Sequence, residues 1–352
     1  RDEVGVRDEP PLVVLVLLVL LAPSRHYFAF AAAGKAITNV GSASQSEFDI
    51  DGDLTCGTGV FTVDKDDWAP PLTMPCPNGS KSIFVGTGAV EPPPATVAPN
   101  LTAFRFQDKA KSSLDNIYGQ GSKQNDTSTW VEVIGSSPVK SDIGNVYSAA
   151  RQGYLQPVNP LPVGWQAAPL TDLVGFMGFE RLSANGKTHL DYEFNQAPFI
   201  KNARGATVPQ RCSALGQMIG TFQCLGPDLL IGVDDGTSKI PTITAYKWVG
   251  TGNSTSVGSF VAITTPTSPY TISVGATNSV AIAPGPWGTF NSRGTLVFGT
   301  NILADTFSEV AVNLTQLTGI QVGCPGTFKT IFIKSRSSSE VNYELKDRIA
   351  PE

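Results

Sequence analysis

The hydrophobic pattern is clearest between residues 173 and 196. Residues 173–179 are apolar on both faces, and residues 188–196 alternate strictly between apolar and polar side chains. Between them, Asn185-Gly186 supplies the positive-φ pair that a tight turn requires. Successive side chains of a strand point to opposite faces, which separates Leu190, Tyr192 and Phe194 from His189, Asp191, Glu193 and Asn195. The segment therefore predicts a β-hairpin whose second strand has a buried aromatic face and a solvated acidic face.

Weaker patterns of the same kind recur along the chain. Residues 228–233 and 240–249 predict a second hairpin with Asp235-Gly236 near its turn, and residues 328–334 predict a late strand. The remaining expected elements are short strands at residues 48–54, 82–85 and 130–134, a brief helical turn capped by Ser141-Asp142, a short amphipathic helix within residues 338–349, and an insertion at residues 199–226.

Composition favours an all-β fold. The chain has 35 Gly and 26 Pro in 352 residues, more than average, while charged residues at 16% are fewer than average. An apolar content of 41% is enough for a large core, which argues against global disorder. A net charge of −5 supplies no basic surface for nucleic acid. We therefore expect one elaborated antiparallel β-sandwich with long loops over residues 34–352, and no nucleic-acid partner.

Residues 1–33 predict an export segment. Residues 12–22 are an uninterrupted apolar run, too short to cross a bilayer of about 30 Å as a helix. This run fits the apolar part of a signal peptide, with A-x-A-like cleavage sites in residues 29–33. The alternative is a membrane segment that extends to residue 33. If it is not cleaved, this segment would be the chain's only contact with a membrane. Both alternatives place the rest of the chain outside the cytoplasm.

The five cysteines agree with an extracellular location. Cys56 and Cys76 bracket one Pro/Gly-rich loop, and Cys212 and Cys224 bracket another. This is the spacing of two local disulfides in an oxidising compartment, with Cys324 left over. A metal site built on cysteines is disfavoured, because the chain has no CxxC pair and only two histidines.

Ordered sequence blocks carry a family resemblance. They are residues 48–54, 67–68, 140–150, 176–196, 228–231, 246–250, 307–314 and 328–347, the last around Lys334-Ser335-Arg336-Ser337-Ser338. In this order they resemble a family of secreted surface proteins from high-GC Gram-positive bacteria. The resemblance spans most of the chain after the export segment. It implies a lectin-like β-sandwich of the jelly-roll, concanavalin type, which in the family precedes prealbumin-like or immunoglobulin-like stalk repeats and a wall or membrane anchor.

Asp49, Asp51 and Asp53 are the best metal candidates in the sequence. Alternate carboxylates on an extended segment can converge on one hard cation, and calcium takes about six to eight oxygen ligands. The segment lacks the complete loop and terminal Glu of an EF-hand, and an Asp-Gly turn with solvated acids accounts for the same residues. Calcium is thus the candidate ion, and no other cofactor is expected.

Asp191 and Glu193 allow two kinds of chemistry on the predicted acidic face. Carboxylates about 5 Å apart serve as nucleophile and acid in retaining glycosidases, and acids on such a strand hold calcium in legume-type lectins. The first Glu of the Glu-x-Asp-x-x-Glu pattern of β-glucanases is missing here, and a solvated strand face accounts for both residues without a function. Trp165 and Trp287 lie in Pro/Gly-rich loops, where exposed rings would stack on sugars.

These features together predict a non-catalytic extracellular module for surface adhesion or glycan binding, whose partner is a cell-surface glycan or protein. Loops at one end of a rigid scaffold would provide the recognition. Two alternatives stay open. One is a glycoside hydrolase that uses Asp191 and Glu193, and the other is a purely structural cap of a surface stalk.

Overall fold

Antiparallel β-sheets make up most of the structure. The computed structural model describes residues 50, 52–56, 67–69, 84, 101–108, 110, 115–152, 172–236, 240–250, 258–264, 273–318 and 328–350. Within these ranges the helical elements are short, namely the 3-10 helix η2 (Thr127–Thr129) and the α-helix α1 (Leu314–Thr318). The all-β antiparallel fold predicted from composition and periodicity is therefore confirmed.

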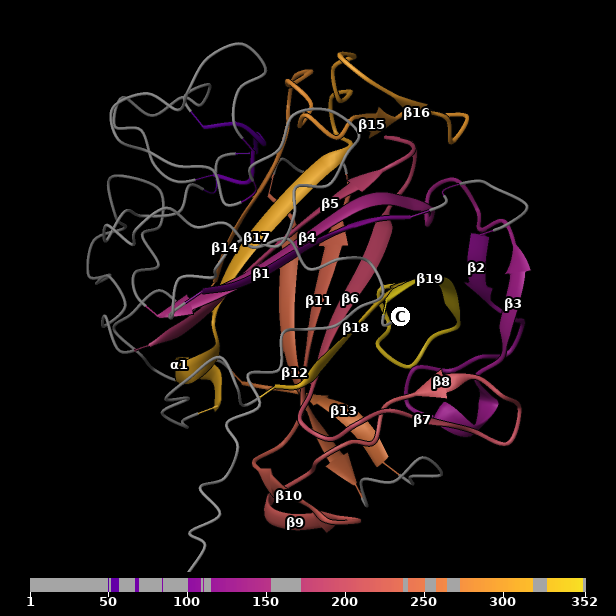
Figure 1. The fold of residues 1–352 in the computed structure, drawn as a ribbon, viewed down its shortest axis with the longest axis vertical. Helices are drawn as coiled ribbons and strands as arrows, with labels where there is room; N and C mark the ends of the chain where they lie inside the picture. The colour runs from indigo at the N-terminus through magenta and orange to yellow at the C-terminus, as the bar shows by residue number, and fades with distance from the viewer. Residues whose placement is uncertain are drawn as a thin grey trace, which may run out of the picture.

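Two large sheets are stacked on each other (Figure 1). The five-stranded sheet has the order β1 (Leu101–Gln107), β4 (Ile143–Gln152), β5 (Leu173–Arg181), β17 (Phe307–Asn313) and β14 (Ser273–Thr277). The eight-stranded sheet has the order β13 (Gly258–Ala262), β12 (Thr242–Gly250), β11 (Leu229–Asp235), β6 (Thr188–Asn195), β18 (Thr330–Arg336), β19 (Leu345–Ala350), β2 (Asp115–Tyr118) and β3 (Glu132–Gly135).

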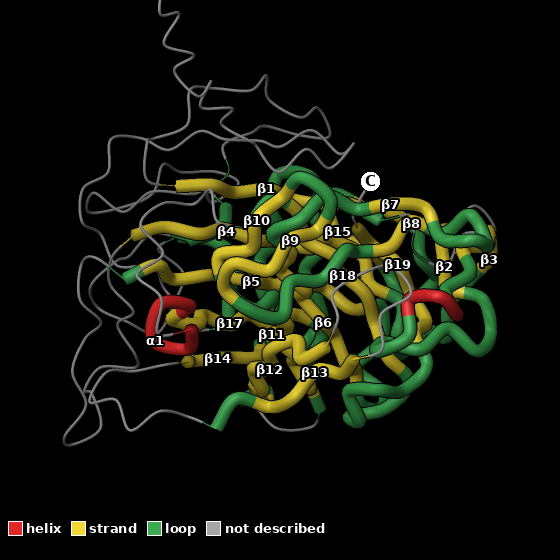
Figure 2. The backbone as a smooth tube through the Cα atoms, turned by 90° about the horizontal axis from the view of Figure 1, so that it is seen from below, coloured by secondary structure: helices red, strands yellow, loops and turns green. Residues whose placement is uncertain are grey.

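Three small two-stranded sheets decorate this sandwich. They pair β7 (Ile200–Lys201) with β8 (Thr207–Val208), β9 (Leu215–Ile219) with β10 (Phe222–Leu225), and β15 (Thr289–Phe290) with β16 (Leu296–Val297). The β9–β10 pair lies below β13 at one end of the molecule in Figure 1. The β2–β3 pair lies on the side opposite α1 (Figure 2).

The main core lies between the two large sheets. Leu190 and Tyr192 of β6 pack there with side chains of β5 such as Met177, all of them buried. The hydroxyl of Tyr192 donates a 2.8 Å hydrogen bond to the carbonyl of Gly178 on β5, so one phenol joins the two sheets. Each such large apolar side chain stabilises the fold by roughly 1.5–3 kcal/mol when it is fully buried.

The predicted hairpin over residues 173–196 is wrong in its pairing, although both strands form. β5 pairs with β4 and β17 in one sheet, whereas β6 pairs with β11 and β18 in the other. The Asn185-Gly186 turn, with Gly186 at φ +84°, therefore connects the two sheets instead of two neighbouring strands. The physical reason is that both strands bury an apolar face in the same core, which stacking across the sandwich achieves as well as a hairpin does.

The brief helical turn predicted after Ser141-Asp142 and the short helix predicted within residues 338–349 are also wrong. Residues 143–152 form β4, and residues 345–350 form β19. A spacing of four residues, which suggested a helix, is also met by alternate positions of a strand. Both segments find partner strands in the large sheets, and this pairing overrides the weak local helical signal.

Other elements agree with expectation. Strands β11 and β12 form the second hairpin, and β18 is the late strand. The described residues near 48–54 form no strand, and the nearest pairing is an isolated bridge between Thr55 and Ala69. The strand predicted at residues 130–134 forms as β3, which begins at Glu132. Among the described residues no helix is long and apolar enough to cross a membrane. The export segment predicted at residues 1–33 lies outside the described residues.

Candidate functional site

Asp191 and Glu193 are fully buried, so the prediction of a solvated acidic face on β6 is wrong. Their face of the sheet points away from the main core and is covered by a second layer of chain. Arg211, from the segment between β8 and β9, lies over this face and donates to the backbone carbonyl of Gln124. The rings of Trp130 and Trp248, both buried, lie 5.7 Å and 4.5 Å from the same guanidinium. Alternation within one strand cannot reveal such a covering layer.

Glu193 is the centre of this buried network. Arg211 Nε and Nη2 lie 2.6 Å and 3.0 Å from its two carboxylate oxygens, and Lys334 Nζ lies 2.5 Å from one of them. Gln124 Nε2 and Asn195 Nδ2 also donate to it. Burial alone would raise the pKa of this carboxyl, but the charges of Arg211 and Lys334 outweigh burial and lower the pKa to about 2.

Asp191 has its own cation. Arg336 Nε lies 2.9 Å and 2.8 Å from the two oxygens of this carboxylate, and Arg336 also approaches Asp234. Burial lowers the pKa of Arg336, but the negative charges of Asp191 and Asp234 outweigh it and raise the pKa. Asp191 and Glu193 are therefore both buried and paired with cations, and neither carboxylate contacts solvent.

The aromatic residue expected to meet a sugar is buried. Trp287 is 5% exposed, packs edge-on to Phe84, and donates a 2.9 Å hydrogen bond from its indole to the Tyr147 hydroxyl. The prediction of an exposed ring was wrong because a Pro/Gly-rich loop folds its tryptophan back onto the five-stranded sheet, under the guanidinium of Arg105. Trp165 lies outside the described residues.

The predicted aspartate run is only partly described. Asp49 and Asp51 lie outside the described residues, so calcium there stays a prediction. Asp53 is buried and accepts a 2.9 Å hydrogen bond from the Thr55 amide, as in an Asx turn.

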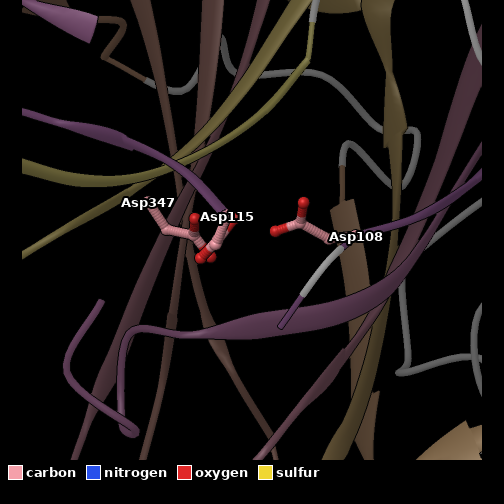
Figure 3. A group of neighbouring side chains, drawn as sticks. All are labelled: Asp108, Asp115 and Asp347. Atoms are coloured by element: carbon pink, nitrogen blue, oxygen red, sulfur yellow. The ribbon is translucent and has the colours of Figure 1, made fainter. Parts of the chain in front are cut away.

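A different group of carboxylates gathers where β2 and β19 meet the end of β1. Asp108, Asp115 and Asp347 each bring one oxygen within 4.8 Å of the others (Figure 3). Asp115 and Asp347 are fully buried. Burial and the negative charges of Asp108, Asp115 and Asp142 raise the pKa of Asp347 well above its usual range, although the Ile143 amide donates to this carboxyl. Acidic groups also cluster without an ion, so the grouping alone does not identify a metal site.

The disulfide predicted between Cys212 and Cys224 is confirmed, with a Cα–Cα distance of 5.7 Å. Cys56 is buried and also disulfide-bonded, whereas Cys76 and Cys324 lie outside the described residues. Disulfides are consistent with an extracellular location.

The Cys212–Cys224 bond closes the β9–β10 hairpin, which presents apolar side chains to solvent. Leu215 is 77% exposed, Met218 58% and Leu225 47%. β9 and β10 are joined by the two-residue turn Gly220-Thr221, and Gly220 has the positive φ of +57° that such a turn needs. The β9–β10 hairpin is thus closed by a disulfide at its base and exposes apolar side chains.

Buried polar groups hold the base of this hairpin. Asp228 accepts hydrogen bonds from the backbone amides of Gln196 and Cys212, at 3.0 Å and 2.9 Å. The Gln196 side chain accepts from the Leu225 amide and donates to the Gly226 carbonyl, both at 2.8 Å. Burial raises the pKa of Asp228 to about 7. The hairpin is therefore fixed at both of its ends.

A cleft of about 310 Å³ opens beside β2 and β19. Its polar lining comes from Gln120, Ser136, Ser137, Glu344 and Lys346. Two of the segments that form it are more than 200 residues apart in the chain, so hydrophobic periodicity gives no sign of it. The sequence pattern also did not predict a role for Arg211, Lys334 or Arg336. For Lys334 and Arg336, the available signal was a pair of cations at alternate strand positions, matching the acids of β6.

No family model, curated protein or solved structure matches the chain. Membership of the bacterial surface-protein family, with its lectin-like and jelly-roll type, stays a prediction.

Proposed function

We propose that the chain is a non-catalytic extracellular recognition module that adheres to another protein through the β9–β10 hairpin. The observation that carries this proposal is the exposure of Leu215, Met218 and Leu225 on a hairpin whose base is fixed by a disulfide and by buried hydrogen bonds. A fixed hairpin loses little conformational entropy on binding, which favours its use as a contact surface.

The chemistry of the hairpin favours an uncharged, apolar partner surface. Residues 212–227 contain no Asp, Glu, Lys or Arg. Burying a large aliphatic side chain contributes roughly 1.5–3 kcal/mol, so three of them can form the energetic centre of an interface. In the described part of the chain β9 and β10 pair only with each other, which leaves strand edges for an added strand. The net charge of −5 disfavours an anionic lipid surface as the partner.

The non-catalytic part of the proposal is supported by the state of Asp191 and Glu193. A retaining glycosidase needs one carboxylate free to attack and another able to donate a proton. Here both side chains are buried, and Glu193 contacts Arg211 and Lys334, which keep it ionised.

The test is binding of the full chain to immobilised collagen, fibronectin and fibrinogen fragments produced without glycans. We expect saturable binding to at least one of them. The triple variant Leu215→Ser, Met218→Ser, Leu225→Ser should lose it. The matched control, Val280→Ser with Leu303→Ser, changes aliphatic side chains that are 64% and 57% exposed elsewhere and should bind normally. Absence of saturable binding to all three proteins, or an equal loss in the control, would overturn the proposal.

A further inference from the structure

We propose that the cleft beside β2 and β19 is a second binding site and that it takes a neutral saccharide. The cleft is lined by the polar residues Gln120, Ser136 and Ser137, and by Glu344 with Lys346. These groups offer donors and acceptors in the mixture that the hydroxyls of a sugar require. The site is separate from the β9–β10 hairpin, since none of its lining residues belongs to that hairpin.

The charges in the cleft cancel, which selects against an ionic ligand. Lys346 Nζ donates to Glu344 Oε2 at 2.8 Å, and each of these side chains is about one quarter exposed or less. The ammonium of Lys346 keeps protons free for further hydrogen bonds, and each carboxylate oxygen of Glu344 has a second lone pair. Hydrogen bonds to charged groups are stronger than those between neutral groups. This pair can therefore bind a hydroxyl group strongly, and its net charge of zero attracts no counter-ion.

The cleft also has an apolar part. Ile117, Tyr118 and Pro138 complete its lining, and Tyr118 is held edge-on against the buried ring of Trp130. A pyranose ring has an apolar C–H face beside its hydroxyl edge, so a surface with both characters is complementary to it. The volume of about 310 Å³ is at the small end of ligand pockets, which span about 300–1,000 Å³, and suits one or two sugar rings.

The acceptor group is positioned before any ligand arrives. The Gly121 amide donates to Glu344 Oε1 at 2.9 Å, which fixes the carboxylate from the side opposite Lys346. Together with Lys346, this amide lowers the pKa of Glu344, so the carboxylate stays ionised. Gly121 lies in the loop after β2, and Glu344 directly precedes β19, so the bond also ties the two walls of the cleft together. A positioned acceptor reduces the entropy lost when the ligand binds.

The test is a glycan array of neutral mono-, di- and trisaccharides, with sialylated and sulfated glycans as the charged comparison, probed with the full chain. A bound glycan is then titrated by calorimetry against two variants. Ser136→Leu places a bulky side chain in the cleft from an exposed position, and Glu344→Gln replaces the charged acceptor by an amide. We expect both to weaken binding by about tenfold or more, as the loss of a charge-assisted hydrogen bond would do.

Glu340→Gln is the matched control, because this exposed residue precedes the same strand but does not line the cleft. It should bind like the parent chain, and near-ultraviolet circular dichroism should show all three variants folded. The hairpin variants of the preceding section should keep their glycan binding. The inference would be overturned if no neutral glycan bound saturably, if only charged glycans bound, or if Ser136→Leu bound as tightly as the parent.

Discussion

Two fully buried carboxylates on the eight-stranded sheet, Glu193 and Asp347, have neighbours of opposite charge. On β6, Glu193 contacts the cations Arg211 and Lys334, and its pKa falls to about 2. At β2 and β19, Asp347 is surrounded by further carboxylates, and its pKa rises well above its usual range. Burial raises a carboxyl pKa in both places, so the difference comes from the sign of the neighbouring charges. The ionised form of Glu193 therefore favours the folded state at neutral pH, whereas ionisation of Asp347 opposes it.

The largest effect should come from removing the charge of Glu193. Glu193→Gln leaves Arg211 and Lys334 buried without their counter-ion, and breaking a buried ion pair in this way costs about 3–5 kcal/mol. Urea unfolding at pH 7, monitored by tryptophan fluorescence, measures the loss. Exposed Glu340→Gln should change stability by less than about 0.5 kcal/mol. A cost below about 1 kcal/mol for Glu193→Gln would mean that the network does not depend on this charge.

Part of this network could be anticipated from sequence, and part could not. The alternation of residues 188–196 correctly placed Asp191 and Glu193 on one face of a strand. The prediction that this face is exposed to solvent was wrong. The cover comes from Arg211 and Trp130, which are distant in sequence, and no local pattern encodes contacts of that kind. Local periodicity therefore gives strands and their faces, whereas burial of a face depends on the rest of the chain.

The same limit applies to strand pairing and to the candidate sites. The Cys212–Cys224 loop was predicted correctly because its signal is local. The Asn185-Gly186 turn was predicted with the wrong partner strand, because a turn fixes direction but not the sheet that the next strand joins. The cleft joins residues near 117–138 to residues 344–346, so only the folded structure brings it together.

Reduction of the Cys212–Cys224 bond should give the next largest effect. In the chain-entropy description, a disulfide that closes a loop of this length, with a sequence separation of 12, stabilises a protein by about 2–3 kcal/mol. The double variant Cys212→Ala, Cys224→Ala should lose about this amount in urea unfolding. Hydrogen exchange should increase first at residues 213–223, while β6 stays protected. Equal loss of protection in the hairpin and in β6 would show that the disulfide supports the whole sandwich instead of the hairpin.

The acidic group at β2 and β19 should respond to pH in the sense opposite to Glu193. A carboxyl whose pKa is raised on folding contributes stability below its unfolded value of about 3.9, and this contribution is lost as pH rises through the folded pKa. A carboxyl with a lowered pKa, such as Glu193, contributes above its unfolded value and loses that stability as pH falls toward 2.

Asp115→Asn tests this contrast because it removes one negative charge beside Asp347. At pH 8 we expect a gain of about 1 kcal/mol in the free energy of unfolding, a size typical of a single substitution, and a smaller gain at pH 4. Thermal melts with a chelator present measure it. Asp108→Asn, at the partly exposed rim, should act in the same direction with a smaller gain. Destabilisation by both variants at pH 8 would mean that the carboxylates are not repelling one another.

The smallest effect on stability should come from the exposed apolar side chains of the β9–β10 hairpin. Their substitution contrasts with that of the buried Glu193, which should affect stability strongly. Leu215→Ser should change the free energy of unfolding by less than about 0.5 kcal/mol, because the side chain is 77% exposed and little of it leaves solvent on folding. The same change should reduce adhesion to the partner protein markedly, since burial would occur only in the complex. Urea unfolding and surface adhesion are measured on one preparation. Substantial destabilisation with unchanged adhesion would assign Leu215 to the fold instead of to the partner.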